Sequence, residues 1–284
     1  MLETIDMNQV IAIALDAGKA VMEIYEKDFD VEYKEDKSPL TEADKKAHEI
    51  ITEGLKKISP LPILSEEGKN IPYEERKNWE RYWCVDPIDG TKEFIKKNGE
   101  FTVNVALIEN GEPVAGVVFA PALGELYWAQ RGEGAFKACV RGSGFGVPKE
   151  EDIQALPMKE NRKGAKGLRI VASKSHLNDE TKKFIESLQN TEPGTRNPEL
   201  LSRGSSLKLV MVAEGSADIY PRLAPTMEWD TAAADAIVRE SGKMVYQYHT
   251  ASSMQHPTSL IPVVYNKENL LNPWFIVQER KEQR

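Results

Sequence analysis

The feature that most constrains this sequence is a run of oxygen-bearing residues, Asp86-Pro87-Ile88-Asp89-Gly90-Thr91. The preceding Tyr82-Trp83-Cys84-Val85 is short and apolar, which predicts a buried strand that ends at this turn. Gly90 allows a tight turn, and Pro87 fixes its own φ angle. Two carboxylates, a carbonyl and a hydroxyl on a rigid turn are ligands that hard divalent cations prefer. The alternative is an acidic turn that only caps the next helix.

Composition limits the class of protein. The chain has 284 residues, 40% of them hydrophobic, which is enough for a large core in one domain or two packed halves. With 45 acidic and 37 basic residues, the net charge of −8 argues against binding to nucleic-acid polymers or anionic membranes. An anionic substrate would therefore need local cations, either bound metal ions or placed Lys and Arg. Cys84 and Cys139 make no disulfide framework.

Neither a signal peptide nor an apolar run of membrane-spanning length is expected. We therefore expect a cytoplasmic protein without a transmembrane segment.

Apolar periodicity predicts helices alternating with strands. Expected helices cover residues 6–27, 41–58, 179–190, 205–214 and 231–241. Expected strands cover residues 101–108, 114–119, 126–130, 134–138, 168–173, 217–220, 245–248 and 260–265. Residues 141–167 are rich in Gly and charge, and we interpret them as an edge excursion that connects two halves, 1–165 and 166–284. Sheets layered with helices in both halves predict an α/β or α+β sandwich.

Three separated acids lie at the ends of expected elements. Glu66 follows a short strand, Asp86 follows the apolar strand, and Asp230 begins a helix. Alone, Asp230 is typical of an N-cap, and Asp44 with Thr41 is typical of a cap with a first-turn acid. Metals a few ångströms apart must share carboxylates from different elements, as in two-metal phosphoryl-transfer sites.

Other motifs carry weaker signals. The glycine run at 142–146 is not followed by an apolar helix, which excludes a dinucleotide-binding loop. The four histidines are scattered without metal-ligand spacing.

Taken together, these motifs resemble the inositol monophosphatase superfamily of lithium-sensitive, magnesium-dependent phosphatases. The resemblance is carried by Glu66-Glu67, by 86–91 and by Trp229-Asp230. The longer runs 83–95 and 98–104 resemble its 3′(2′),5′-bisphosphate nucleotidase branch, the CysQ type. Further matching segments are 173–176, 204–208, 213–215 and 220–222, and the resemblance extends from the first helix to 271–273.

The resemblance implies a layered αβαβα sandwich with a magnesium site. The first ion would bind the Glu66 and Asp86 carboxylates and the Ile88 carbonyl, and the second would share Asp86 and bind Asp89 and Asp230. A third, more weakly held ion is often seen in the family. Thr91 with Asp44 would orient and deprotonate the attacking water, so the expected catalytic residues are Asp44, Glu66 and Thr91.

The resemblance also implies a small nucleotide substrate. The reacting phosphate would lie among Glu66, Ile88, Asp89, Gly90, Thr91 and Asp230, and the 5′-phosphate and nucleoside would be held by His176, Ser205, Lys208 and Arg222. Lys208 follows Ser205 by three residues on an expected helix, which places both on one face. An Arg can bind phosphate bidentately, which a Lys cannot. Each of these cations alone could be a solvated surface charge.

The expected reaction is magnesium-dependent removal of the 3′-phosphate of adenosine 3′,5′-bisphosphate, giving AMP and phosphate. The same site could accept 3′-phosphoadenosine 5′-phosphosulfate, which would place the enzyme in sulfur assimilation, and the resemblance allows peripheral association with the inner membrane. One alternative is a relative acting on inositol phosphates or sugar bisphosphates, against which 92–94 and 205–208 argue. Another is an inactive metal or nucleotide sensor, but no expected ligand or water activator is missing.

Overall fold

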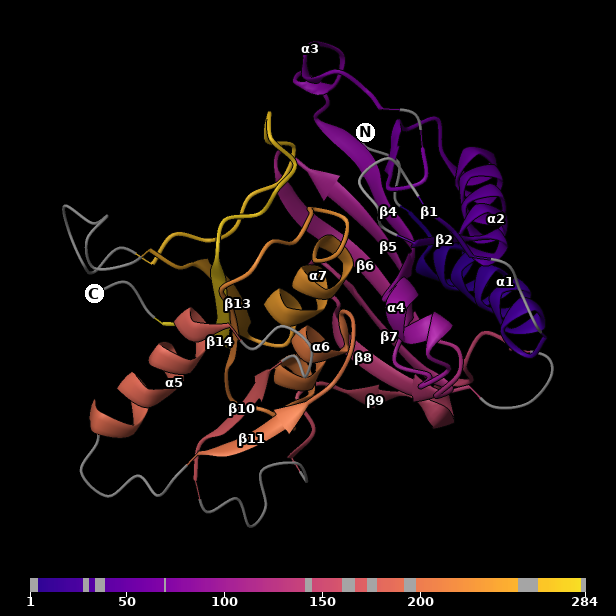
Figure 1. Ribbon diagram of the computed structural model, residues 1–284. Coiled ribbons are helices and arrows are strands. Elements are labelled where there is room, and N and C mark those ends of the chain that lie inside the picture. The colour runs from indigo at the N-terminus through magenta and orange to yellow at the C-terminus, as the bar shows by residue number, and fades with distance from the viewer. Residues whose placement is uncertain are drawn as a thin grey trace.

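The structure is a computed structural model that describes residues 5–27, 31–33, 39–68, 70–140, 145–159, 167–172, 178–191, 198–249 and 260–281. Helix layers alternate with sheet layers across these residues, in the αβαβα order that the family resemblance implies (Figure 1).

The outer helix layer consists of α1 (Met7–Tyr25) and α2 (Glu42–Ile58), both close to their predicted bounds. The two helices pack against each other and against one face of the large sheet (Figure 1). Each has one apolar face, as the spacing predicts, and buries it in a core shared with the sheet. The short antiparallel ribbon of β1 (Val31–Tyr33) and β2 (Pro39–Thr41) leads into α2.

The large sheet has seven strands in the order β3-β4-β5-β6-β7-β8-β9. Its strands are β3 (Ile63–Ser65), β4 (Arg81–Asp89), β5 (Thr102–Glu109), β6 (Glu112–Ala120), β7 (Glu125–Gln130), β8 (Gly134–Cys139) and β9 (Gln154–Ala155). β3 and β4 are parallel and the other pairs are antiparallel. Helices cover both faces, so β4, β5 and β6 are buried along nearly their whole length. The expected edge excursion after residue 141 forms β9 and the short 3-10 helix η1 (Glu150–Asp152) where it is described.

The inner helix layer consists of α6 (Leu207–Glu214) and α7 (Ala232–Glu240). α7 packs across β5, β6 and β7 (Figure 1). Gly116 on β6 permits this contact, because a Cβ atom there would lie only 2.3 Å from the Ala233 carbonyl oxygen. The close approach fixes the start of α7, and with it the segment that carries Asp230, over the sheet.

The second sheet layer contains β12 (Tyr220–Arg222), β14 (Phe275–Glu279) and β13 (Lys243–Gln247), in that order and antiparallel. The parallel pair β10 (Arg169–Ala172) and β11 (Glu199–Ser202) adjoins it through a bridge between Ile170 and Ile219. α5 (Asp179–Thr191) forms the last layer beyond these strands (Figure 1). The short helices α3 (Tyr73–Arg76) and α4 (Thr91–Ile95) flank β4.

Several local predictions differ from the structure. The strand expected at 260–265 is wrong, since only Pro262 makes an isolated bridge there and proline cannot donate to a ladder. The strand expected at 217–220 begins later, at Tyr220. The strand expected to end at Val85 continues, with a bulge, to Asp89 as β4. Strands β1, β2, β9, β11 and β14 were not predicted. The helix expected from Ser205 begins only at Leu207, and Ser205 has a left-handed φ of 54°.

The division of the chain near residue 165 stays a prediction. One cluster of core side chains extends from Leu64 to Val277 and joins the two expected halves. No helix among the described residues is long and apolar enough to cross a membrane.

Candidate active site

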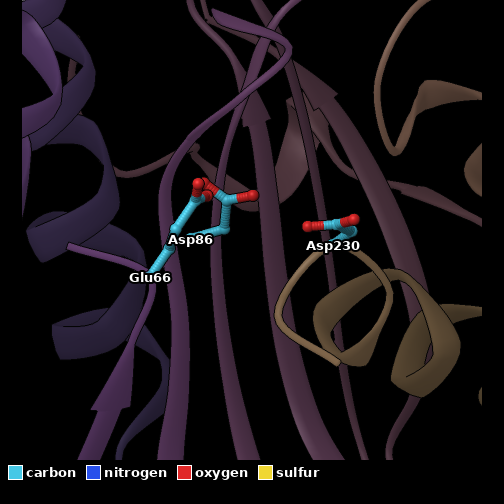
Figure 2. A group of neighbouring side chains, drawn as sticks. All are labelled: Glu66, Asp86 and Asp230. Carbon is cyan, nitrogen blue, oxygen red and sulfur yellow. The ribbon is translucent and has the colours of Figure 1, made fainter. Parts of the chain in front are cut away.

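Three acids from distant parts of the chain converge at one end of the large sheet. The carboxylates of Glu66, Asp86 and Asp230 each place an oxygen within 4.8 Å of the others. In Figure 2, Glu66 and Asp86 lie side by side, and Asp230 faces them from the coil that leads into α7. Glu66 and Asp86 lie close together because β3 and β4 are parallel, and parallel strands end at the same edge of a sheet.

The bulged end of β4 aims further oxygens at the same region. The pairing of β4 with β5 shifts register between Asp86 and Asp89, so the chain bulges there. Gly90 has a φ of 92°, a conformation that favours glycine, and it ends the bulge and starts α4. The Ile88 amide donates to Asp86 Oδ1 at 3.0 Å, and the Ile88 carbonyl accepts from Thr91 Oγ1 at 3.3 Å.

Burial and mutual repulsion make this cluster unfavourable without a cation. Asp86 is only 1% exposed, and burial, followed by the nearby charge of Glu66, raises its pKa well above the usual range. Burial also raises the pKa of Asp230, with the charge of Asp89 as the next cause. Clustered, buried carboxylates that supply only oxygen ligands fit a hard divalent cation. Its charge would offset both the cost of burial and the repulsion between the carboxylates.

Asp44 lies beside this cluster and has two sets of contacts. Its Oδ2 accepts from the Thr41 amide at 2.8 Å and from the Thr41 hydroxyl at 2.7 Å, which forms the capping box of α2. Its Oδ1 accepts from Thr91 Oγ1 at 3.4 Å. Both roles of Asp44 that the sequence allows, helix cap and partner of Thr91, are therefore compatible in one geometry.

Asp89, at the end of β4, is half-buried, lines the cleft described below and contacts residues from the second half of the chain. Its Oδ2 accepts from Ser205 Oγ at 2.7 Å and from Ser206 Oγ at 2.8 Å. Ser206 Oγ also lies 2.7 Å from the Asp230 carbonyl oxygen and 2.9 Å from Asn104 Nδ2. Ser206 and Asn104 were not among the predicted site residues, although both lie in segments that carry the family resemblance, 204–208 and 98–104.

A cleft of about 220 Å³ opens onto the acids and also contains the predicted cations. It is lined by Glu66, Asp89, Gly90, Thr91, Lys92, Glu93, Ser205, Lys208, Leu209, Tyr220, Arg222, Thr226, Asp230, Thr231 and Phe275. Lys208 is 6% exposed, and its Nζ donates to the carbonyls of Ser205 at 2.6 Å and Arg203 at 3.3 Å. Burial lowers the pKa of Lys208 to about 8.

Arg222 enters the same cleft from β12. Its Nη2 donates to the Pro225 carbonyl at 2.8 Å, whereas Nε is buried without a hydrogen-bond partner among the described residues. A buried donor without a partner is rare and fits an anionic ligand. His176 lies outside the described residues, so its predicted place beside these cations stays a prediction.

The layered fold, and the acidic cluster in a cleft that also contains Lys208 and Arg222, define the class of metal-dependent phosphatases. The family model described as "Inositol monophosphatase family" matches residues 3–276. The chain belongs to the inositol monophosphatase family.

Three relatives illustrate the similarity. The chain is 41% identical to the 3′(2′),5′-bisphosphate nucleotidase CysQ of Salmonella typhimurium, over 95% of this chain and 98% of that protein. It is 46% identical to the crystal structure of CysQ from Bacteroides thetaiotaomicron, with a TM-score of 0.82 over 96% of this chain and 97% of that one. The IMPase of Thermotoga maritima is 27% identical, with a TM-score of 0.65 over 94% of this chain and 89% of that one.

Proposed function

We propose that this protein hydrolyses the 3′-phosphate of adenosine 3′,5′-bisphosphate to give AMP and phosphate, with magnesium as its cofactor. The observation that carries the proposal is one cleft that holds both the acidic cluster and two cations, Lys208 and Arg222. A bisphosphate could place its reacting phosphate at the metal-binding acids and its second phosphate at Lys208 and Arg222. The similarity to nucleotidases named CysQ supports the same substrate class. 3′-Phosphoadenosine 5′-phosphosulfate has the same arrangement of anions and is a second expected substrate.

We assign two magnesium ions to the acids. Glu66, Asp86 and the Ile88 carbonyl would hold the first, and Asp86, Asp89 and Asp230 the second. When bound, these ions neutralise the phosphate oxygens and make an attacking water more acidic. Inhibition by lithium, and a third weakly held ion, stay predictions from the family resemblance. A lithium titration of phosphate release at saturating magnesium tests the predicted inhibition. A rate that does not change at millimolar lithium would contradict it.

Thr91 and Asp44 would prepare the water. The single proton of Thr91 Oγ1 can be donated to Asp44 Oδ1, at 3.4 Å, or to the Ile88 carbonyl, at 3.3 Å, and the lone pairs of the hydroxyl can accept a hydrogen bond from water. The proton that the water loses on attack would pass through the Thr91 hydroxyl to Asp44. Thr41 holds the other Asp44 oxygen and thereby fixes the direction of the carboxylate.

Lys208 and Arg222 would bind the phosphate that does not react. Lys208 is a buried cation on the first turn of α6, and Arg222 presents its unpaired Nε in the same cleft. An inositol monophosphate has no second phosphate and would leave both cations without an anionic partner. This charge arrangement favours the nucleotide over the inositol phosphate alternative.

Replacing either cation tests this assignment. Lys208→Ala and Arg222→Ala are each expected to reduce kcat/KM for adenosine 3′,5′-bisphosphate about 10- to 100-fold, since a charge-assisted hydrogen bond contributes roughly 1.5–3 kcal/mol. A small monophosphate lacking the 5′ group should lose far less. The measurement is phosphate release from both substrates with each variant. Equal losses on both substrates, or none on the bisphosphate, would contradict the assignment.

The pKa of Lys208 predicts a pH dependence of substrate binding. Burial lowers this pKa to about 8, so the ammonium loses its proton, and its charge, as the pH rises through that value. We expect the KM for the bisphosphate to rise above this pH by up to about tenfold, since one charge-assisted contact is lost. Lys208→Arg retains the charge and should flatten the profile. A profile that is the same for wild type and Lys208→Arg would contradict the role of this lysine.

A further inference from the structure

We propose that Ser206, held by Asn104, is a positioning residue that orients Asp89 relative to Asp230 and so sets the affinity of the second cation site. The inference rests on the proposed function, because it takes Asp89 and Asp230 as ligands of one ion. It assigns a role to two neutral residues that lie behind the acids.

The Ser206 hydroxyl is the point where three segments meet. Its oxygen lies 2.8 Å from Asp89 Oδ2, 2.7 Å from the Asp230 carbonyl oxygen and 2.9 Å from Asn104 Nδ2. A serine hydroxyl has one proton and two lone pairs. The Asn104 amide therefore donates to a lone pair, and the single proton is left for Asp89 or for the Asp230 carbonyl. One atom thus connects the end of β4, the middle of the sheet and the loop before α7.

Water cannot substitute for these contacts. Ser206 and Asn104 are each 1% exposed. Asn104 Oδ1 is also buried without a hydrogen-bond partner among the described residues, an unfavourable arrangement. An apolar residue at this position of the strand would pack without leaving a buried oxygen unpaired. The presence of asparagine therefore points to a specific need for its Nδ2 donor.

The register of the sheet places Asn104 where this donor is needed. On β5, Asn104 pairs with Asp86, and Thr102 pairs with Asp89. Thr102 Oγ1 lies 2.6 Å from Ser205 Oγ, which itself donates to Asp89 Oδ2. Thr102 and Asn104 of β5 therefore support the two serines, and both serines contact the same oxygen of Asp89. This fixes the rotation of the carboxylate and leaves Oδ1 for a cation.

Ser206 differs from Ser205 in its access to ligands. Ser205 lines the cleft, whereas Ser206 is not among the lining residues and contacts a ligand only through Asp89 and Asp230. Hydrogen bonds behind a ligating carboxylate orient it, and their loss typically weakens metal affinity about 10- to 100-fold. We expect the effect of Ser206 to lie in this range.

The test is calorimetric titration of the full chain with Mn²⁺ or Mg²⁺ in the absence of substrate. Ser206→Ala should weaken one binding step about 10- to 100-fold. Ser241→Ala is the matched control: Ser241 is also buried and donates to a carbonyl, that of Val238, at 2.8 Å. It should keep the wild-type affinity. Wild-type affinity in Ser206→Ala, or absence of metal binding by the wild-type protein, would overturn the inference.

A double variant separates positioning from stability. Ser206→Ala leaves the Asn104 amide without its acceptor and should lower Tm. Ser206→Ala/Asn104→Leu removes both polar groups and should have a higher Tm than the single variant. A structural role alone predicts that metal affinity recovers with Tm. Positioning predicts that the affinity stays low in the double variant. Because the readout needs no nucleotide, an inactive wild-type protein that binds metal would refute the proposed function and leave this inference standing.

Discussion

Asp86→Asn is expected to lower kcat about 1,000-fold or more, equivalent to ~4 kcal/mol of transition-state stabilisation, and at the same time to stabilise the metal-free protein. The asparagine keeps an acceptor for the Ile88 amide but removes a buried charge that both proposed cations share. The pKa of Asp86 is raised in the folded protein, so its ionised form opposes folding at neutral pH. Turnover and Tm, each with magnesium and with a chelator, check both effects.

The sign of the stability effect can be checked through pH. A folded-state pKa above the unfolded value means that the metal-free wild type gains stability as the pH falls through the raised pKa. The Tm advantage of Asp86→Asn should therefore be largest at alkaline pH and shrink on acidification. Magnesium should raise the Tm of the wild type, which binds it in the folded state, and of the variant much less.

A control distinguishes this cluster from ordinary buried acids. Asp235 is also fully buried, but its Oδ1 lies 3.0 Å from Arg239 Nε. Burial raises the pKa of Asp235 too, but Asp235→Asn leaves the buried guanidinium of Arg239 without its partner and should lower Tm with or without metal. If metal-free Asp86→Asn likewise has a lower Tm than wild type, the acids do not repel one another as described.

Asp44→Asn is expected to have the second-largest effect, a loss of about 10²–10⁴ in kcat, the usual contribution of a general base. The introduced amide could still accept hydrogen bonds from Thr41 but could not take a proton from Thr91. The cost in stability should be limited to about 1 kcal/mol, typical of a weakened helix cap. Pre-steady-state phosphate release and chemical unfolding measure the two effects separately.

Thr41→Ala is the matched variant for Asp44. It removes the hydroxyl that donates to Asp44 Oδ2 at 2.7 Å and leaves the charge of Asp44 in place. We expect a similar loss of stability with a much smaller loss of kcat. Comparable losses of kcat in both variants would mean that Asp44 acts only as the cap of α2.

Some parts of the fold and the site could be predicted because short sequence patterns determine them. The oxygen-rich run at 86–91 and the bounds of α1, α2, β5 and β6 arise from patterns within a few residues. By contrast, the sequence pattern marks Glu66, Asp86 and Asp230 only as acids at the ends of separate elements, and it is sheet pairing and the packing of α7 that bring them together.

Other parts depended on contacts that sequence patterns do not encode. Serine is compatible with a helix start, but Ser205 is held outside α6 by hydrogen bonds to Asp89 and Thr102 from the other half of the chain. Asn104 ends the matching run 98–104, but that run assigns it no role, and its contact with Ser206 appears only in the fold. Short edge strands such as β11 have weak patterns, because Leu200 there is exposed.

A comparison of two substrates with the wild-type protein tests the proposed reaction itself. Phosphate release and the nucleotide product are measured for adenosine 3′,5′-bisphosphate and for inositol 1-phosphate, with magnesium and with a chelator. We predict that AMP is formed, that the chelator abolishes turnover, and that kcat/KM for the bisphosphate is at least about 100-fold higher, as two charge-assisted contacts would give. Equal or greater activity on inositol 1-phosphate, or release of the 5′-phosphate, would contradict the proposed function.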